Sequence, residues 1–305
     1  MICGTDISSD SSTGSVWKGC DFVAVMTLRF NSKILGLATS VKIIIPSTLP
    51  KTIEKPDYEK LYGEKANMPV LWLLHGGSDN YSDWHGCTQV QLLADEYGYA
   101  VVMPDAQQSS YANMAYGPRW LDYFTQELPE YIYQRFPFSR ERKDNFISGM
   151  SMGGSGTVKL ALLQPERFSV AVPIASAVEV ARRYAEGRWD RVPGGAPKDG
   201  KPSVFNDIYG CDDNPSAILG TNEDCFYLLK KNVEEGKELP KFLHCQGTED
   251  HTYNGNVEYR AYAKELGVEI DWIEAPGVHD WKSWNLYLPK AFEYIKQCRQ
   301  EAGIE

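Results

Sequence analysis

The sequence of 305 residues lacks an excess of positive charge and lacks any long apolar run. Lysine and arginine number 31 against 41 aspartate and glutamate residues, so the net charge is −10. Nucleic acids and anionic membranes are bound through basic patches, and this balance disfavours both. No window approaches the ~18 apolar residues that cross a bilayer. We therefore expect no nucleic-acid partner and no membrane partner, and a neutral or cationic small substrate fits better.

The seven cysteines include no CxxC pair, which argues against a cysteine zinc site or a disulfide framework. Reduced thiols are expected, although a bridge between Cys211 and Cys225 stays open for an oxidising compartment. The first residues, "MICGTDISSDSSTGS", lack the basic start and apolar core of a signal peptide. A cytoplasmic protein is expected, with a trimmed secreted chain as the alternative.

Short apolar runs and helical patterns alternate along most of the chain. Two β-rich runs near the N-terminus, "DFVAVMTLRF" and "TSVKIIIP", predict an antiparallel hairpin. The later runs are "VLWLLH", "YAVVMPD", "NFISG", "SVAVPIA", "KFLHCQG" and "VEIDWIEA", and the helical segments between or after them are 87–97, 121–135, 153–164, 222–235, 255–266 and 281–298. Continuous apolar strands are typical of a parallel sheet covered on both faces. The pattern predicts an α/β fold with a mostly parallel central sheet, an antiparallel N-terminal hairpin and helices on both faces.

A single catalytic domain is expected over residues 21–300, after a polar arm at residues 1–20. The charged segment 51–68 is most simply a solvated loop. Residues 180–221 break the alternation, being rich in glycine, proline, aspartate and aromatic residues. A loop of that length inside a domain is usually functional or disordered. Three aromatic residues favour partial packing, so we expect an irregular excursion over the C-terminal edge of the sheet: Trp189, Phe205 and Tyr209.

A serine lies between two glycines in Gly149-Met150-Ser151-Met152-Gly153, which matches G-x-S-x-G. The motif follows the apolar run "NFISG" and opens a helical pattern, which is the context of a nucleophile elbow. Glycines flank the serine there because a Cβ would clash in the strained turn. Ser151 is therefore a candidate nucleophile, and the alternative is a glycine-rich helix start that merely fits a tight corner.

A serine hydroxyl needs a base and an acid, which follow it in the order Ser, acid, His in α/β-hydrolases. His279 lies in "APGVHDWKSW", between the last strand and the C-terminal helix, and is the candidate base. Two of the five histidines precede the serine, His244 fits a packed strand residue, and His251 fits a surface loop. Asp250, after the strand "KFLHCQG", is the candidate acid, with Glu249 as the alternative.

Two backbone N–H groups should stabilise the oxyanion. One is expected from Met152, after the candidate nucleophile, and the other from the "HGGS" loop after "VLWLL". Gly77 is the favoured donor in that loop because glycine lets the backbone approach a substrate closely. An ordinary turn at "HGG" is the alternative.

The stretches "LLHGGSDNYSDW", "YGPRWLDYFTQELPEYI", "ISGMSMGGSGTVKLAL", "GTEDHTYNGN" and "GVHDWKSWN" resemble the esterase D-like family of α/β-hydrolases. That family includes tributyrin, feruloyl and acetylxylan esterases, S-formylglutathione hydrolases and antigen 85 mycolyltransferases. The resemblance covers roughly residues 22–298. It implies Ser151, Asp250 and His279 as a triad with Gly77 and Met152 as oxyanion donors.

The expected chemistry is ester hydrolysis through an acyl-enzyme, with no metal and no cofactor. Short acyl esters of small alcohols, glycerol or sugars are the first expectation, and feruloyl or acetyl esters of plant polysaccharide are the second. Acyltransferase and S-formylglutathione hydrolase activities are lower-ranked alternatives. The sequence leaves open whether the protein forms a homo-oligomer. Three tryptophans beside the site either pack the cleft wall or form an aromatic platform for the substrate: Trp84, Trp281 and Trp284.

Overall fold

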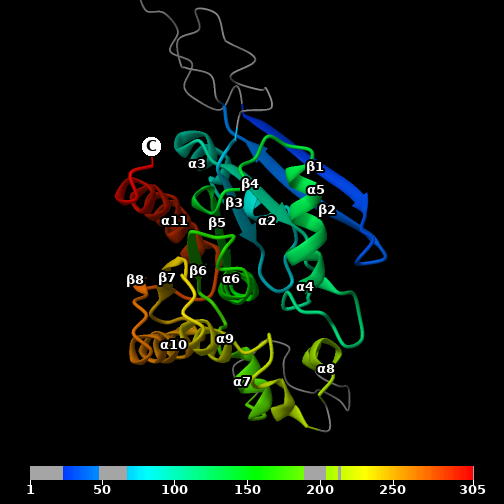
Figure 1. Ribbon diagram of the computed structural model, residues 1–305, viewed down its shortest axis with the longest axis vertical. Helices are drawn as coiled ribbons and strands as arrows, with labels where there is room; N and C mark the ends of the chain where they lie inside the picture. The colour runs from blue at the N-terminus through cyan, green and yellow to red at the C-terminus, as the bar shows by residue number, and fades with distance from the viewer. Residues whose placement is uncertain (1–22, 48–66, 189–203, 212–213, 305) are drawn as a thin grey trace, which may run out of the picture.

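A computed structural model describes residues 23–47, 67–188, 204–211 and 214–304 of the chain. Its centre is one eight-stranded sheet in the order β1-β2-β4-β3-β5-β6-β7-β8 (Figure 1). The strands are β1 (Ala24–Asn31), β2 (Ala38–Ile45), β3 (Val70–Leu74), β4 (Ala100–Pro104), β5 (Asn145–Met150), β6 (Val170–Ile174), β7 (Lys241–Gly247) and β8 (Asp271–Ala275). β1 and β2 pair antiparallel, β2 joins β4 antiparallel, and β4, β3, β5, β6, β7 and β8 run parallel. The predicted mostly parallel sheet with an antiparallel N-terminal hairpin is confirmed.

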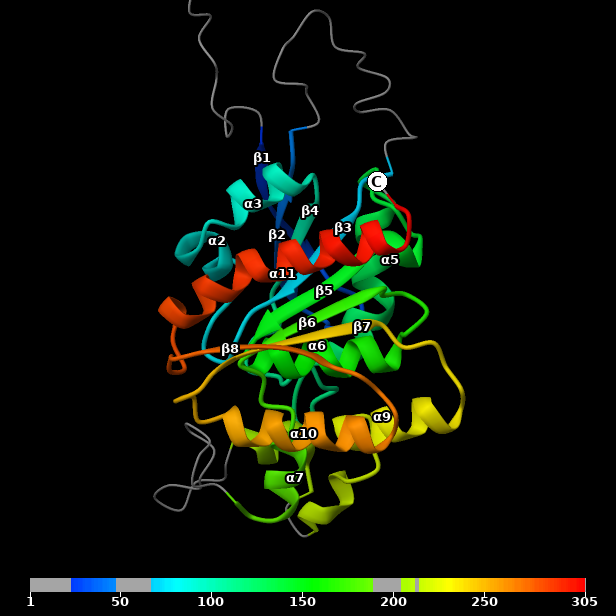
Figure 2. The ribbon, with the colours of Figure 1, turned by 90° about the vertical axis from the view of Figure 1, so that its left-hand side faces the viewer.

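Helices cover both faces of the sheet, as predicted. They are α2 (Asp83–Cys87), α3 (Val90–Tyr97), α4 (Trp120–Asp122), α5 (Leu128–Tyr133), α6 (Met152–Leu163), α7 (Val180–Ala185), α8 (Val204–Tyr209), α9 (Cys225–Glu234), α10 (Tyr253–Glu265) and α11 (Trp281–Glu301). Helices α3 and α11 pack on one face, and α5, α6, α9 and α10 pack on the other. Figure 2 shows α11 lying across the strands of the first face.

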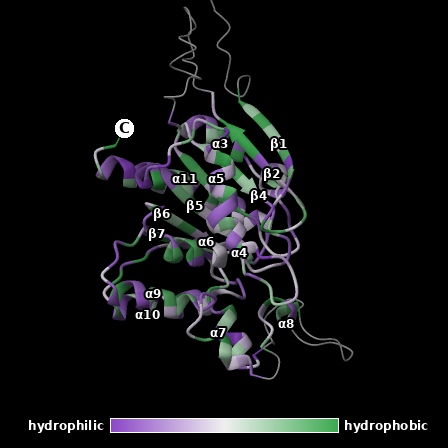
Figure 3. Ribbon diagram, turned by 45° about the vertical axis from the view of Figure 1, so that its right-hand side comes forward, coloured by the Kyte–Doolittle hydropathy of each residue, from purple (hydrophilic) through white to green (hydrophobic). Residues whose placement is uncertain are grey.

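The apolar strands are buried on both sides because their side chains alternate between these two layers. Along β3, Val70, Trp72 and Leu74 contact the layer of α6, whereas Leu71 and Leu73 contact the layer of α3 and α11. Hydrophobic residues therefore run through the sheet, while α10 and α11 carry much of the hydrophilic surface (Figure 3). This arrangement brings the carboxyl ends of the parallel strands to one edge of the sheet.

The helix expected over residues 121–135 contains a π-helical turn at Tyr123–Glu127, between α4 and α5. Pro129 has no N–H to donate, and the Leu128 N–H reaches back five residues to the carbonyl oxygen of Tyr123. The carbonyl oxygen of Thr125 instead accepts a hydrogen bond from the Gln164 side chain at 3.1 Å. The predicted helical segment is confirmed, and the π-helical turn within it lies directly before α5, whose first turn contains Pro129.

The segment at 180–221 is less irregular than predicted. Its described part forms α7, α8 and the 3₁₀ helix Pro215–Ile218, which share a small apolar cluster: Ala112, Ala181, Tyr184, Phe205, Ile208 and Ile218. The short helices were missed because glycine and proline dominate the composition of the segment. Residues 1–20, most of 51–68 and Trp189 lie outside the described residues.

Two further expectations concern cysteines and membranes. Within the described ranges, the cysteines are free, including Cys211 and Cys225, so the bridge left open between these two is not formed. No helix in those ranges is both long and apolar enough to cross a membrane.

A buried ion pair fastens α11 to the start of β5. Arg299 Nη1 lies 2.6 Å from Asp144 Oδ1 and 3.1 Å from the carbonyl oxygen of Lys143. We expect Asp144→Asn to lower the free energy of unfolding by about 3–5 kcal/mol, because it leaves a buried guanidinium without its counter-charge. The matched change Glu130→Gln, in the exposed pair with Arg140, should cost less than about 1 kcal/mol in urea denaturation. Equal losses in the two variants would contradict this assignment.

Candidate active site

Ser151 occupies a strained turn between β5 and α6. Its backbone has φ 55° and ψ −117°, a region that serine rarely adopts, and its N–H donates to the carbonyl oxygen of Ile174 at 3.0 Å. A Cβ at Gly149 would lie 2.6 Å from the carbonyl oxygen of Gly153. A Cβ at Gly153 would lie 2.4 Å from that of Leu74. The expected strand-turn-helix context, with glycines required by space, is confirmed.

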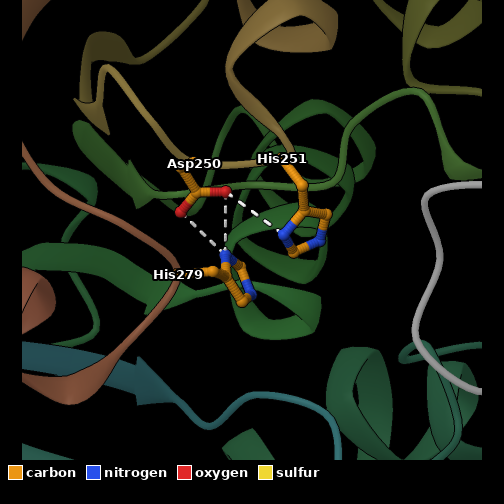
Figure 4. A group of neighbouring side chains, drawn as sticks. All are labelled: Asp250, His251 and His279. Carbon is orange, nitrogen blue, oxygen red and sulfur yellow. Dashed lines mark hydrogen bonds and ion pairs between the residues drawn. The ribbon is translucent and has the colours of Figure 1, made fainter.

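Ser151, His279 and Asp250 form one chain of hydrogen bonds. His279 Nε2 lies 2.8 Å from Ser151 Oγ, and His279 Nδ1 lies 2.8 Å and 3.0 Å from the two carboxylate oxygens of Asp250 (Figure 4). The three residues follow β5, β8 and β7, so the carboxyl edge of the sheet brings them together from distant parts of the chain. With Nδ1–H donated to the carboxylate, the Nε2 lone pair faces the hydroxyl and can accept its proton.

Asp250 is held as an ionised, fixed acceptor. Its side chain is buried, and its Oδ1 accepts the N–H and the hydroxyl of Thr252, each at 2.8 Å. Burial raises the pKa of Asp250, but hydrogen bonds from His279 and Thr252 and the attraction of the imidazole outweigh it and leave the pKa below its usual value. The carboxylate can therefore fix the tautomer and orientation of the His279 ring.

The two neighbouring acidic residues, Glu249 and Asp280, accept hydrogen bonds from other groups. Glu249 accepts the Gly277 N–H at 2.5 Å, and that bond lowers the pKa of the exposed Glu249 carboxyl. Asp280 accepts the Ser283 N–H at 2.8 Å and caps the N-terminus of α11. The choice of Asp250 over Glu249 therefore agrees with the geometry: within the described part of the chain, Asp250 is the one of these three acids that is hydrogen-bonded to His279.

His251 is more than the surface loop residue that the sequence suggested. Its Nδ1 lies 3.6 Å from Asp250 Oδ1, and its ring centroid lies 4.3 Å from that of His279. Burial lowers the pKa of His251, and the charge of His279 lowers it further. The signal in the sequence was its adjacency to Asp250, which placed it on the same turn.

Two other histidines, His244 and His85, make contacts outside the Ser151–His279–Asp250 chain. His244 is buried in β7 and stacks against Tyr259 and Trp272, with ring centroids 5.9 Å and 6.1 Å away. Burial lowers the pKa of His244 to about 3, so the prediction of a packed strand histidine is confirmed. His85 lies on α2, where its Nε2 pairs with Gln91 at 3.1 Å.

A buried histidine shapes the loop that carries Gly77. The Ala106 N–H donates to His75 Nε2 at 2.9 Å, so the proton of the neutral ring is on Nδ1, which lies 2.8 Å from the carbonyl oxygen of Gly76. Because C=O and N–H point in opposite directions across a trans peptide, this bond turns the Gly77 N–H away from the His75 ring. Tyr111 also donates to the carbonyl oxygen of His75 at 2.8 Å.

Backbone strain gathers at the carboxyl edge of the sheet. Non-glycine residues with positive φ follow β3, β4, β5 and β6 in turn: Ser78, Gln107, Ser110, Tyr111, Ser151 and Ala175. Such conformations cost energy and persist only where the surroundings impose them, and they cluster at functional sites. Five of these positions, unlike Ser151, carried no motif that could have revealed them in the sequence.

The edge of the sheet encloses a cavity of about 240 Å³. Its lining includes Ser151, Met152, His251, His279 and Gly77, together with apolar side chains from the 180–221 segment: Val180, Phe205, Ile208 and Tyr209. Sequence reasoning missed its buried ion pair, in which Lys159 Nζ lies 2.5 Å from Glu223 Oε2 and donates to the carbonyl oxygen of Ser110 at 2.7 Å. Lys159 lies on α6, two helical turns after Ser151, and no sequence motif marks it.

The three tryptophans occupy different places. Trp284 lines the cavity, and its ring stands edge-on to His279 with centroids 5.0 Å apart. Trp281 packs against Trp284, and Trp84 packs edge-on against Trp281. Trp84 is buried, and its indole N–H donates to the carbonyl oxygen of Leu74 at 2.8 Å. Trp84 and Trp281 therefore support the site from behind, and a substrate platform built from all three rings does not fit this geometry.

Two glycines of the site should respond differently to an added methyl group. Gly153→Ala should destabilise the protein by at least ~2 kcal/mol, since its Cβ meets the backbone of β3. Gly77→Ala should change stability by less than about 0.5 kcal/mol, because its nearest neighbour is the Gln108 side chain at 3.5 Å. Thermal denaturation of both variants checks the contrast, and a fully stable Gly153→Ala protein would refute the crowded turn.

The chain is similar to characterised ester hydrolases. It matches the family described as "Putative esterase" over residues 53–295. An acetyl esterase from Caldicellulosiruptor saccharolyticus is 28% identical over 287 residues, covering 90% of this chain and 99% of that protein. Staphylococcus aureus fluorophosphonate-binding serine hydrolase F has a TM-score of 0.76 at 32% identity, covering 90% of this chain and 98% of that one.

A second solved structure agrees with this. The S-formylglutathione hydrolase FrmB of Staphylococcus aureus has a TM-score of 0.72 at 33% identity, with 90% of this chain and 98% of that chain covered. The resemblance to esterase D-like hydrolases, drawn from short stretches of sequence, is thereby confirmed. The chain belongs to this esterase family of α/β-hydrolases and is a carboxylesterase-type hydrolase.

Proposed function

We propose that the protein hydrolyses short-chain acyl esters through an acyl-enzyme on Ser151. The observation that carries the proposal is the continuous hydrogen-bond chain from Ser151 Oγ through His279 to the buried carboxylate of Asp250. A serine hydroxyl becomes a nucleophile when an adjacent base takes its proton, and the base needs a third group to orient it. All three parts lie within hydrogen-bond reach of one another.

In the first half of the cycle, Ser151 Oγ attacks the ester carbonyl while His279 Nε2 accepts the hydroxyl proton. The tetrahedral intermediate collapses, and the leaving alcohol takes that proton from His279. Water then attacks the acyl carbonyl while His279 Nε2 removes its proton. The second tetrahedral intermediate collapses, the bond from the acyl carbon to Ser151 Oγ breaks, and the proton on His279 returns to Ser151 Oγ. Throughout, Asp250 holds the Nδ1–H tautomer and stabilises the imidazolium that forms twice in each turnover.

The developing oxyanion needs donors fixed in advance. Met152 is the first residue of α6, so its N–H has no acceptor within the helix. Gly77 lines the same cavity, and the hydrogen bond from His75 to Gly76 fixes the peptide that carries the Gly77 N–H. We assign these two N–H groups as the oxyanion hole.

The cavity supports the choice of short acyl groups. Pockets for drug-sized ligands span about 300–1,000 Å³, and the cavity of about 240 Å³ lies below that range. Apolar side chains of α7 and α8 line it beside Ser151, which suits a small hydrocarbon chain. The acetyl esterase that is similar over 90% of this chain carries a short acyl group in its name. Esters of acetate and butyrate with small alcohols or sugars are therefore the proposed substrates.

The roles of Ser151 and Asp250 can be tested with p-nitrophenyl acetate. Ser151→Ala should lower kcat by roughly a million-fold, and Asp250→Asn by roughly ten-thousand-fold, since asparagine favours the wrong imidazole tautomer. The matched variant Glu249→Gln should keep activity within a few-fold, because the amide oxygen can still accept the Gly277 N–H. If Glu249→Gln were as damaged as Asp250→Asn, the assignment of the acid would be wrong.

Acyl-chain length tests the size argument separately. We expect kcat/KM for p-nitrophenyl acetate and butyrate to exceed that for octanoate by at least about ten-fold, because the longer chain exceeds the cavity. Methyl ferulate serves as the bulky aromatic comparison. A preference for octanoate or ferulate would leave the catalytic residues in place but refute the short-chain proposal in favour of a larger site.

A further inference from the structure

Asp250, His251 and His279 place three potential metal ligands at one point of the active site (Figure 4). One ligand atom from each side chain lies within 4.8 Å of the other two. The ester chemistry uses Asp250 and His279, whereas His251 has no part in it. Two imidazoles and a carboxylate are a ligand set typical of zinc.

The distances suit a tetrahedral ion. Zinc bonds of about 2.0–2.2 Å to nitrogen and oxygen place neighbouring ligand atoms ~3.3 Å apart. Asp250 Oδ1 lies 3.0 Å from His279 Nδ1 and 3.6 Å from His251 Nδ1. The two imidazole nitrogens lie within 4.8 Å of each other, so a rotation of the His251 side chain toward His279 would bring the three atoms around one ion, with a water as the fourth ligand.

The surroundings permit such an ion to enter and stay. The side chains of His251 and His279 are 31% and 19% exposed, and both line the cavity. Thr252 donates two hydrogen bonds to Oδ1 of Asp250 and so fixes the carboxylate, as hydrogen-bond partners of metal-binding carboxylates usually do. The charge of the neighbouring Arg183 is balanced by Glu179, 2.6 Å away. The net charge of −10 favours the approach of cations.

We propose that this cluster binds Zn²⁺ and that the bound ion reversibly switches off ester hydrolysis. The consequence for activity rests on the proposed function of His279. The ion would take the place of the proton between His279 Nδ1 and Asp250, and that proton would move to Nε2 of the same neutral ring. Nε2 would then be a donor toward Ser151 Oγ and could no longer accept the serine proton.

The first experiment measures binding without turnover. Zn²⁺ is titrated calorimetrically into the Ser151→Ala protein, with and without His251→Gln, in a buffer that does not chelate zinc. We expect one site per chain, weakened more than ~10-fold by His251→Gln because one of three ligands is lost. Mg²⁺ should not compete, since it prefers oxygen ligands in octahedral geometry.

The matched control removes a second pair of potential zinc ligands, a histidine and a cysteine that lie away from the proposed site. His85 and the exposed Cys87 lie on α2, and the double variant His85→Gln/Cys87→Ser should bind Zn²⁺ as the unaltered protein does. Undiminished binding in the His251→Gln protein, or binding lost only in the α2 variant, would overturn the proposed site.

The second experiment measures inhibition. Hydrolysis of p-nitrophenyl acetate by the unaltered protein should fall as Zn²⁺ rises and return on addition of EDTA. In His251→Gln, inhibition relative to that variant's own metal-free rate should need more than ~10-fold higher Zn²⁺. Zinc that binds at His251 without inhibiting an active enzyme would refute the switch. A protein inactive on every ester would instead refute the proposed function, while the titration still decides the metal site.

Discussion

The fixed distance between β3 and the start of α6 is the constraint on which the rest of the site depends. Gly153 lies so close to β3 that an added Cβ would reach the carbonyl oxygens of Leu74 and His75 at 2.4 Å and 2.6 Å. In that space the chain turns from β5 into α6 with Ser151 at a positive φ of 55°. The strain at Ser151 is therefore a consequence of packing, and the burial of α6 against the sheet offsets its conformational energy.

The same packing explains why His75 belongs to the site although it touches none of the reacting groups in the proposed cycle. Its carbonyl oxygen faces α6 and the hydroxyl of Tyr111, while its ring joins the Gly76 carbonyl to the Ala106 N–H. The loop after β3 is thus fixed to the loop after β4 by a neutral ring with one defined tautomer. These buried contacts fix the loop that carries Gly77, which we propose as an oxyanion donor placed in advance.

Much of this architecture could be predicted because local sequence signals agree with the fold. Uninterrupted apolar runs marked the strands, Gly98 and Gly267 marked two helix ends, and both adopt positive φ in the structure. The motif around Ser151 and the loop positions of Asp250 and His279 followed from the order of strands. What could not be predicted depends on contacts between distant segments. The contact of His251 with His279 and the pairing of Lys159 with Glu223 join residues 28 and 64 positions apart, and neither has a motif.

The pair of Lys159 and Glu223 also bears on which esters the cavity accepts. Lys159 comes from α6, Glu223 from the turn before α9, and Ser110 from the loop after β4, so three segments meet at the cavity lining. An unpaired ammonium at this depth would attract an anionic acyl group, but the paired carboxylate cancels its charge. A charged acyl group would have to compete with that pair and lose its own hydration, while a neutral one would do neither. If the protein acts as proposed, this lining would favour uncharged acyl groups through the same contact that joins α6 to the turn before α9.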